Sequence, residues 1–254
     1  MKKTWQDYGR EWLDTLVVAI SVAMAFRAYF YEPFNIPTGS MQPTLWGNHT
    51  RAGEDATAFD VWPLSWAKWL ATGERHVECV AEASGVAHVR ARGDGYADVR
   101  VGASAKTFRL PTDACAAIDG RQFRAGETVW KGTVATGDFI FVNRWLWNWR
   151  RPRDGEVMIF STTGIKALVQ GTHYIKRMKA RPGETYALEH PVAAGPGRSV
   201  MPDVVTMGTD EYFACGDNFG NSFDSRYWGP VPGANLRGVG SVVFWPFSGW
   251  RRIR

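Results

Sequence analysis

The sequence predicts a mainly β protein with one membrane-spanning helix near its N-terminus. An apolar segment occupies residues 12–31, which suits a helix that crosses a bilayer. From about residue 75 onward, short runs rich in β-branched and aromatic residues alternate with turns that contain glycine and proline. No helical periodicity of useful length occurs after residue 70. A chain of 254 residues holds one large domain or two modest ones.

The apolar segment is the first element. Its uncharged core, Thr15 to Phe26, is short for a membrane span, but extension to Trp12 and Tyr31 gives the roughly twenty residues that a bilayer requires. Aromatic residues at both ends suit the membrane interfaces. A cleaved signal peptide also begins with basic residues, but the bulky run "AFRAYFYEPF" occupies the place of a small-residue cleavage site. A buried amphipathic helix is the other alternative; we expect a retained span.

Charges around the span predict its orientation. Lys2, Lys3 and Arg10 precede it, so the positive-inside rule places residues 1–11 in the cytoplasm and residues 32–254 on the outer face. The net charge of +5 suits anionic lipid or nucleic acid. Because no nucleic-acid-binding motif is present, we expect no nucleic-acid partner. The C-terminal run "GWRRIR" fits either a lipid contact or a solvated tail.

Residues 47–136 predict a separate small β domain. The runs "HVECVAEA", "GVAHVRAR", "YADVRVGA" and "KTFRLPTD" alternate apolar and polar residues. They predict a meander of antiparallel strands, preceded by one short helix within "FDVWPLSWAKWLATGE". Further strands are predicted in the run "VWKGTVATGDFIFVNRWLW" and in residues 155–163, 172–180, 209–217 and 238–247.

The three cysteines predict neither a zinc site nor dithiol redox chemistry, because Cys79, Cys115 and Cys215 form no C-x-x-C pair. An odd number leaves at least one thiol unpaired within the chain. A bridge between Cys79 and Cys115 stays open in an oxidising compartment. We expect no metal and no cofactor.

Ser40 is a candidate nucleophile. It lies in "FNIPTGSMQPTL", where Gly39 gives the loop conformational freedom and prolines stiffen both flanks. By itself this pattern is more typical of an ordinary turn. A serine nucleophile needs a base, and sequence order excludes neither His49 nor His173. Serine–lysine pairs are another solution, provided that burial lowers the lysine pKa.

Lys176 is the candidate lysine. In "HYIKRMKARPGET", strand geometry places Tyr174, Lys176 and Met178 on one face. Lys176 then has apolar or amphipathic neighbours, as a desolvated base would, although an exposed basic strand fits the pattern equally well. The segment "GDNFGNSFDSRYWGPVP" (residues 216–232) supplies short polar side chains that build turns or orient a base.

Together these segments resemble type I signal peptidases, the membrane-bound Ser/Lys proteases that remove signal peptides from exported proteins. "FRAYFYEPFNIPTGSMQPTL" resembles the end of the family's anchor and its nucleophile segment. "GDFIFVNRW" and "RPRDGEVMIF" resemble the strand pair that follows, "YIKRMKARPGE" the general-base segment, and "GDNFGNSFDSRYWGPVP" the closing polar segment. The resemblance covers about residues 10–46 and 137–250. It implies a signal-peptidase-type β-sheet catalytic domain made of residues 32–46 and 137–254, with 47–136 inserted as a domain of unknown role.

The resemblance also implies roles for individual residues. Ser40 is expected as the nucleophile and Lys176 as the general base, with the Thr38 hydroxyl and the Ser40 N–H in the oxyanion hole. The residues expected to orient and support the base are Ser222 and the ion pairs Arg177–Asp217 and Asp224–Arg226. The residues expected to form shallow apolar substrate pockets are Phe34, Ile36, Pro37, Met41, Leu45, Tyr174 and Ile175.

The implied function is that of a single-pass serine endopeptidase of the bacterial inner membrane, with its catalytic domain on the outer face. The expected partners are preproteins with signal peptides, membrane lipid and the protein-export translocon. Two alternatives stay open: a degenerate homologue that binds preproteins without cleavage, and a self-cleaving Ser/Lys protease of the repressor type. Two features depart from the family: Phe219-Gly220 stands where Arg-Asp is usual, and residues 47–136 interrupt a normally direct connection.

Overall fold

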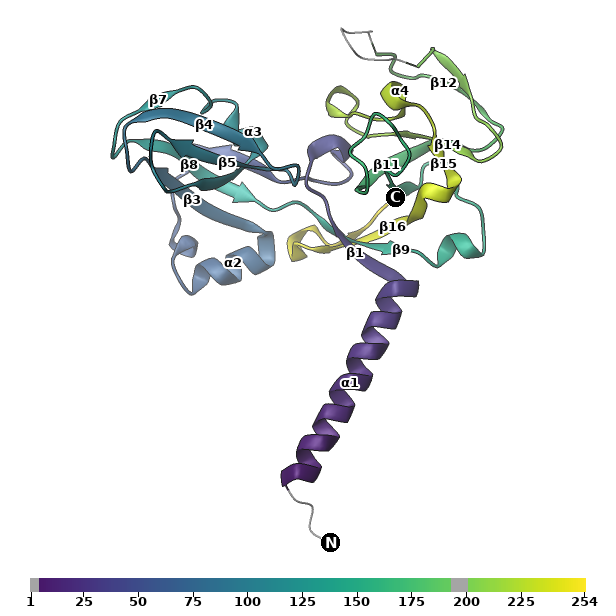
Figure 1. Ribbon diagram of the computed structural model, residues 1–254, viewed down its shortest axis with the longest axis horizontal. Helices are drawn as coiled ribbons and strands as arrows, with labels where there is room; N and C mark the ends of the chain where they lie inside the picture. The colour runs from purple at the N-terminus through teal and green to yellow at the C-terminus, as the bar shows by residue number, and fades with distance from the viewer. Residues whose placement is uncertain (1–4, 193–200) are drawn as a thin grey trace.

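The computed structural model describes residues 5–192 and 201–254. Lys2 and Lys3, on which the predicted orientation partly rests, lie outside the described residues. The chain forms a long N-terminal helix, a large curled sheet and a smaller group of strands beside it (Figure 1). The predicted fold class, mainly β with an apolar N-terminal helix, is confirmed.

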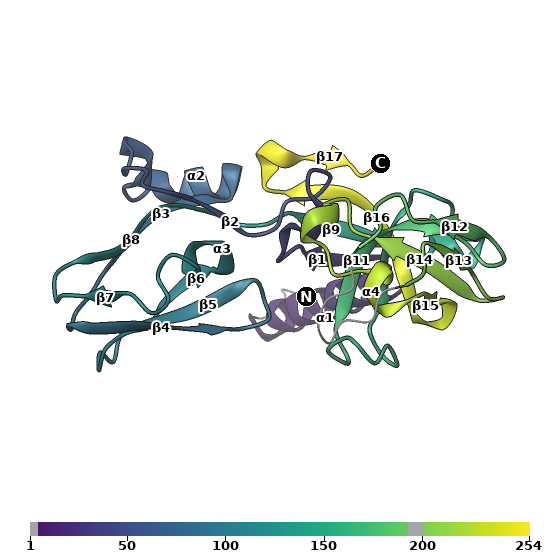
Figure 2. The ribbon, with the colours of Figure 1, turned by 90° about the horizontal axis from the view of Figure 1, so that it is seen from above.

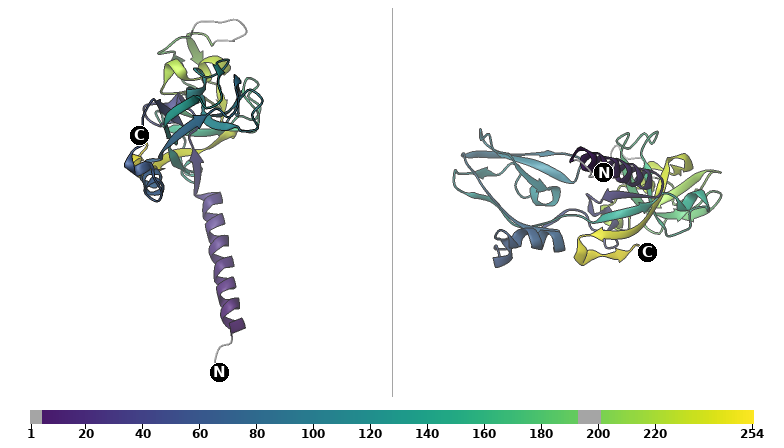
Figure 3. Two further views of the ribbon diagram at one scale, coloured as in Figure 1. Left: turned by 90° about the vertical axis from the view of Figure 1, so that its left-hand side faces the viewer. Right: turned by 90° about the horizontal axis from the view of Figure 1, so that it is seen from below.

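Helix α1 (Trp5–Tyr29) projects alone from the β-rich body (Figures 1 and 3). Its 25 residues, at 1.5 Å each, extend over about 38 Å. Residues Tyr8–Tyr29 are long and apolar enough to cross a membrane, and the most apolar stretch is not buried against the rest of the chain. The hydroxyls of Thr15 and Ser21 donate to carbonyls four residues earlier, so these polar groups are satisfied within the helix.

The large sheet contains eight antiparallel strands, with β1 at one edge. In spatial order they are β1 (Tyr31–Asn35), β9 (Phe139–Asn143), β16 (Leu236–Trp245), β10 (Val157–Ser161), β11 (His173–Ala180), β14 (Glu211–Cys215) and β15 (Val231–Pro232), and β17 (Arg251–Arg252) pairs with β16. A separate ribbon pairs β12 (Thr185–Ala187) with β13 (Val204–Thr206). Pairing of β1 with β9 brings the segment after the membrane helix against a strand from the second half of the chain.

Apolar side chains cover both faces of this sheet. The central strand β10 is buried along its whole length. Val157 and Ile159 pack with Ile140 on one face, whereas Met158 and Phe160 pack with other residues on the opposite face. A strand covered on both faces gives a continuous apolar run, which is why "VMIF" carries no alternation.

The smaller group of strands has its own core. Three strands are ordered β2 (His49–Ala52), β8 (Thr128–Ala135), β3 (Glu74–Val80), and four are ordered β6 (Phe108–Pro111), β5 (Tyr96–Val101), β4 (Gly85–Ala91), β7 (Gln122–Phe123). Figure 2 shows this group beside the large sheet. Two helices belong to it, α2 (Leu64–Thr72) and α3 (Thr112–Cys115). All three cysteines are buried free thiols, and Cys79 and Cys115 lie in this core without a bond between them.

The predicted four-strand meander is wrong in one respect: β3 pairs with β8, not with β4. Strand β8 is almost wholly buried, with β2 on one side and β3 on the other. The run "VWKGTVATGDFIFVNRWLW" therefore breaks into β8 and β9. Gly137 lies at the break, where a Cβ atom would come within 2.0 Å of the Ile36 carbonyl oxygen.

The two chain segments that connect the smaller group to the large sheet are hydrogen-bonded to each other. The Trp46 N–H donates to the Asp138 carboxylate at 2.9 Å, and the Asp138 N–H donates to the Trp46 carbonyl at 2.8 Å. The Asn48 side chain accepts from the Gly137 N–H at 2.9 Å. We call these contacts the clasp. The remaining short helices are η1 (Gly39–Met41), η2 (Ala58–Asp60), η3 (Leu146–Asn148), η4 (Phe219–Asn221), α4 (Ser225–Trp228), η5 (Gly233–Asn235) and η6 (Phe247–Gly249).

Candidate active site

Ser40 lies in the middle of the 3-10 helix η1, a few residues after β1. The turn is held from below by Met41 and Leu45, whose side chains are fully buried in the core. From the opposite side Asn218 donates its backbone N–H to the Ser40 carbonyl and its side-chain amide to the Gly39 carbonyl, both at 3.1 Å. Apolar anchors and these two hydrogen bonds fix the position of a side chain that is itself only 8% exposed.

The Ser40 hydroxyl is hydrogen-bonded to Lys176. The distance from Lys176 Nζ to Ser40 Oγ is 2.7 Å. Lys176 comes from β11, where it pairs with Met158 of β10, and it is 4% exposed. Burial lowers its pKa to about 8, against a partial opposing effect of the Asp224 and Asp217 carboxylates. A substantial fraction of this amine is therefore neutral at pH values near 8, where it can accept a proton.

An ion pair holds β11 against the polar segment 216–232. Arg177 follows Lys176 and binds Asp217 through Nε and Nη2, each at 2.7 Å from a different carboxylate oxygen. Arg177 Nη2 also donates to the Thr44 hydroxyl at 3.1 Å. Burial raises the pKa of Asp217, but the hydrogen bonds from Arg177 and Thr44 outweigh it and the net shift is downward. The Arg177 guanidinium thus joins β11, the polar segment and the chain just after Ser40.

A second ion pair is fully buried within the polar segment. Arg226 Nε lies 2.8 Å from Asp224 Oδ1, and the other oxygen of Asp224 accepts from the Gly216 N–H at 3.0 Å. Burial alone would lower the Arg226 pKa, but the hydrogen bond and charge of Asp224 raise it overall. Phe219, at the position where the family usually has arginine, lies 5.5 Å from both the Arg226 guanidinium and the Lys179 ammonium. These cation–π contacts lie at the position where the sequence departs from the family pattern.

Ser222 is buried beside the Ser40 turn, but its hydroxyl has no hydrogen-bond partner among the described residues. Its expected contact with Lys176 is therefore not formed in this state. Gly216 explains how the two serines come close: a Cβ atom at this position would lie 2.2 Å from Ser222 Oγ and 2.4 Å from the Ser40 carbonyl oxygen. Only glycine leaves this space open; the motif at residues 216–232 begins with Gly216, but the sequence pattern assigned it no role.

A cavity of about 860 Å³ opens over the Ser40–Lys176 pair. One wall is the segment Pro37–Thr38, and another is the first half of β11 with Thr172. Among the described strands, β14 pairs only with the second half of β11, from Arg177 onward. The backbone of residues 173–176 therefore presents an unpaired edge to the cavity, where an extended peptide can add as a strand.

The residues predicted to bind substrate fall into two groups. Pro37, Tyr174 and Ile175 line the cavity, and so does Thr38, whose side chain is exposed. Phe34, Ile36, Met41 and Leu45 do not line it; Ile36, Met41 and Leu45 are buried beneath it in the core of the large sheet. Of the two histidines left open as bases, His173 lines the cavity and stacks edge-on against Phe34, and His49 contacts the Gly47 carbonyl.

The smaller group of strands contributes a wall that no sequence pattern indicated. Arg92, Gly93 and Asp94, at the tip of the β4–β5 hairpin, line the same cavity. The tip packs closely on the Ser40 segment, because a Cβ atom on Gly95 would lie 2.3 Å from the Pro37 carbonyl oxygen. Both charged residues of the tip form ion pairs within the smaller group: Arg92 with Asp98 at 2.9 Å, and Asp94 with Arg109 at 2.6 Å. The tip contacts a segment that lies more than fifty residues earlier in the sequence, which local sequence patterns do not encode.

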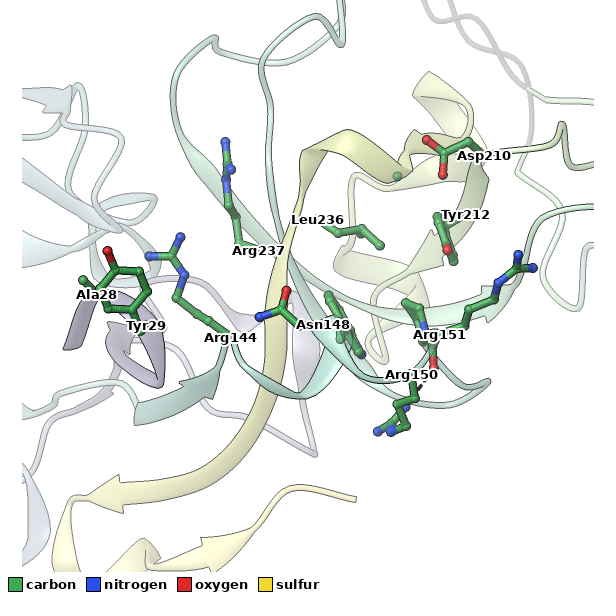
Figure 4. A pocket seen from close by; sticks show the side chains of 13 residues that line it. Ala28, Tyr29, Arg144, Asn148, Arg150, Arg151, Asp210, Tyr212, Leu236 and Arg237 are labelled. Atoms are coloured by element: carbon green, nitrogen blue, oxygen red, sulfur yellow. Dashed lines mark hydrogen bonds between the residues drawn. The ribbon is translucent and has the colours of Figure 1, made fainter. Parts of the chain in front are cut away.

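A second cavity, of about 710 Å³, lies at the end of α1 and shares no residue with the first (Figure 4). Its wall contains Ala28 and Tyr29, the last two residues of the helix. The arginines in the wall are Arg144, Arg150, Arg151 and Arg237. Arg144 pairs with Glu32 and Arg150 with Glu156, whereas Arg151 and Arg237 have no carboxylate partner among the described residues.

Comparison with known proteins finds similarity to signal peptidases. The family described as signal peptidase, peptidase S26, matches residues 9–58 and 196–245, which include Ser40 and Ser222 but not Lys176. A probable signal peptidase I-2 from Synechocystis is 32% identical over 45% of this chain and 58% of its own length. A signal peptidase I from Leptolyngbya laminosa is 30% identical over 46% of this chain and 64% of its own. The mouse mitochondrial inner membrane protease subunit 1 is 26% identical over 48% of this chain and 68% of its own length.

The fold and the cavity define a β-sheet protein with a buried serine–lysine pair beside an apolar helix. Within that class, the chain is similar to type I signal peptidases of the S26 family. The matches span between about half and two thirds of the length of the first two curated relatives, and they leave most of residues 47–136 without a counterpart in the family match.

Proposed function

We propose that the chain is a membrane-anchored serine endopeptidase that removes signal peptides from exported preproteins, with Ser40 as nucleophile and Lys176 as general base. The 2.7 Å contact between Ser40 Oγ and Lys176 Nζ in a buried site carries the proposal. The lowered pKa of Lys176, about 8, supports it, because a base must be neutral before it accepts a proton. The relatives named as signal peptidases supply the substrate class.

The proposed reaction has two stages. Neutral Lys176 Nζ accepts the Ser40 hydroxyl proton while Oγ attacks the scissile carbonyl carbon, and the negative oxygen is held by the Ser40 N–H and the Thr38 hydroxyl. The tetrahedral intermediate then breaks its C–N bond, and protonated Lys176 donates to the leaving amine. Water, deprotonated by Lys176, attacks the resulting ester carbonyl. The C–Oγ bond then breaks, Lys176 returns the proton to Ser40 Oγ, and the signal peptide leaves as a carboxylic acid that ionises in solvent.

The substrate would bind as an extended strand. Its backbone would pair with the unpaired edge of β11 at residues 173–176, opposite Pro37. Small side chains before the cut would face Tyr174, Ile175 and Pro37, because these residues line the cavity, whereas Ile36, Met41 and Leu45 are buried in the core. We further propose that α1 spans the bacterial inner membrane, with Arg10 and the preceding residues in the cytoplasm and the cleft on the outer face.

Substitution of either reactive residue tests this proposal. Ser40→Ala and Lys176→Ala should each lose cleavage of a labelled preprotein with a small-x-small motif, the lysine variant by at least about 10²–10⁴-fold. Lys179→Ala is the matched control, because Lys179 lies on the same strand but pairs with Glu189 away from Ser40. Retained activity in either reactive-site variant contradicts the Ser–Lys assignment. A wild-type chain that binds the preprotein without cutting it would favour a degenerate homologue.

A further inference from the structure

The segment Ala58–Leu70 exposes an unusual number of large apolar side chains. It comprises η2 and most of α2, at the start of the smaller group of strands. The exposed fractions are 61% for Phe59, 65% for Val61, 83% for Trp62, 48% for Leu64 and 62% for Trp66. Burial of one such side chain stabilises by about 1.5–3 kcal/mol, so a contiguous exposed group of this kind indicates a surface that is covered in use.

The only charges in this segment are paired with each other. Lys68 Nζ lies 2.7 Å from Asp60 Oδ1, and the two side chains are 17% and 6% exposed. Burial raises the pKa of Asp60, but the hydrogen bonds from Lys68 and Thr57 outweigh it and hold the pKa well below its usual range. The outward surface is thus apolar, with the indole N–H groups of Trp62 and Trp66 as polar sites. This combination is typical of a helix that lies in a membrane interface.

Helix α2 is fixed to the large sheet and does not hang free. Trp245 of β16 donates its indole N–H to the Leu70 carbonyl at 2.8 Å, and its ring lies 5.1 Å from that of Trp69. The Gly73 carbonyl accepts from the Thr136 N–H at 3.0 Å. These contacts use Trp69 and the C-terminal end of the helix, and they leave Trp62, Leu64 and Trp66 exposed. The orientation of the apolar surface is therefore set by the rest of the fold.

Helix α2 lies on the side of the body from which α1 projects, in two perpendicular views (Figures 1 and 3). The end of α1 is surrounded by groups that suit a lipid headgroup region. Phe30 stacks on Trp145, Trp145 contacts Trp149, and Trp149 is 72% exposed. The arginine-lined cavity of Figure 4 adjoins the same end of the helix. Aromatic and basic residues there mark the level at which a bilayer surface meets the body.

We infer that the η2–α2 surface docks onto the lipid bilayer, so that residues 47–136 form a second membrane contact besides α1. A bilayer fits better than a second copy of the chain, because the surface is rich in tryptophan, lacks net charge and lies at the level where α1 leaves the body. This inference rests on the proposed span of α1 and is independent of cleavage.

Site-specific fluorescence tests the docking. Ala67 is exposed on α2, so Ala67→Cys keeps every tryptophan, and the three native cysteines are buried and resist labelling. The full chain, labelled with an environment-sensitive dye, is reconstituted in phosphatidylcholine–phosphatidylglycerol vesicles that contain lipids with a quencher near the headgroup. The dye at position 67 should lose at least about half of its emission. The same dye at Val86→Cys, exposed on β4 of the same group of strands, should keep it.

Two further variants make the result decisive. With Trp62→Ser and Trp66→Ser added, quenching at position 67 should fall at least severalfold, while the unfolding temperature in detergent stays unchanged because both side chains are exposed. Ile20→Cys, in the middle of α1, reports the span with a quencher deep in the bilayer. Quenching at position 20 without quenching at position 67 overturns the docking and leaves the span intact. Loss of quenching at position 20 overturns the span itself. Self-quenching at position 67 that rises with protein density, without lipid quenching, indicates a second copy instead.

Discussion

At the scale of single residues, the burial of Lys176 has two opposing effects: it prepares the amine as a base, and it destabilises the fold. Lys176 is only 4% exposed, and no carboxylate contacts its ammonium directly among the described residues. The nearest compensating charges, Asp224 and Asp217, are each bound to an arginine. Burial therefore determines the direction of the pKa shift, to about 8. The same burial that prepares the amine as a base destabilises the folded chain while the amine is protonated.

The lowered pKa predicts the pH dependence of cleavage. Below pH 8 Lys176 is mostly protonated and cannot accept the Ser40 proton, so kcat/KM should rise about tenfold per pH unit and level off above pH 8. The measurement is kcat/KM for a peptide substrate without titratable groups, between pH 6 and 10. A profile that is flat through pH 8, or that falls as the pH rises from 6, would contradict a lysine base.

The same shift predicts that Lys176→Met stabilises the protein at pH 7. The folded pKa, about 8, lies below the unfolded reference of 10.5, so protonated Lys176 lowers the free energy of unfolding by up to about 3 kcal/mol below pH 8, and this penalty fades as the pH rises toward 10.5. Thermal unfolding of the full chain in detergent, followed by tryptophan fluorescence, should show a higher midpoint for the variant at pH 7. The gain should vanish near pH 10.5; a lower midpoint at pH 7 would refute the argument.

The sequence predicts some residue positions and not others for a physical reason. Strand alternation alone placed Lys176 with Met178 on one face, and both are buried. Met41 and Leu45 were expected in the substrate pockets but lie beneath the cavity, because an apolar side chain near a reactive serine serves the core as readily as a ligand. Gly216 was missed because its role depends on the approach of Ser40 and Ser222, which sequence spacing does not encode.

At the scale of elements, strand β11 has two different halves. From Arg177 onward it pairs with β14, and before that residue its edge is open to the cavity. The change occurs at the residue after the base, where Arg177 turns to bind Asp217. The sequence predicted the strand and its faces well, since both follow from local alternation. It could not predict which edge stays open, since pairing depends on distant segments.

The hairpin tip of β4–β5 predicts an effect on substrate selection. Because Arg92 lines the cavity, Arg92→Ala should lower kcat/KM severalfold more for peptides with an acidic residue near the cut than for those with a basic one. Asp98→Ala is the control, since it removes the same ion pair from outside the cavity lining, and an exposed pair contributes little stability. Identical changes in both variants, or none in either, would mean that the tip does not contact substrate.

At the scale of the whole molecule, two bodies of β structure with separate cores meet at the cleft. The clasp between Trp46 and Asp138 holds the connecting segments side by side, although residues 47–136 lie between them in sequence. The core of the smaller group contains only residues from within it. The alternating runs within residues 47–136 predicted a separate β domain, but no sequence pattern indicated that the second body reaches back to the segment around Ser40.

We expect that removal of the second body, residues 47–136, causes only a partial loss of function. Deletion of residues 47–136 with a short linker should keep the Ser40–Lys176 contact, because the clasp positions already adjoin and the core of the large sheet is separate. Cleavage of a preprotein in detergent should therefore persist, with weaker substrate selection because the hairpin tip is gone. Complete loss of cleavage, with unchanged unfolding of the remaining domain, would show that the second body is required for catalysis.

The bond between Trp245 and α2 has a consequence for the freedom of the whole body. A body held by one helix alone rotates about the helix axis and tilts on it, so a groove on its surface points in many directions. Docking through α2 adds a second contact with the lipid some distance from the first. The body then no longer tilts toward or away from the bilayer, although the molecule still turns about the bilayer normal, so the groove over Ser40 keeps one inclination and one height above the lipid.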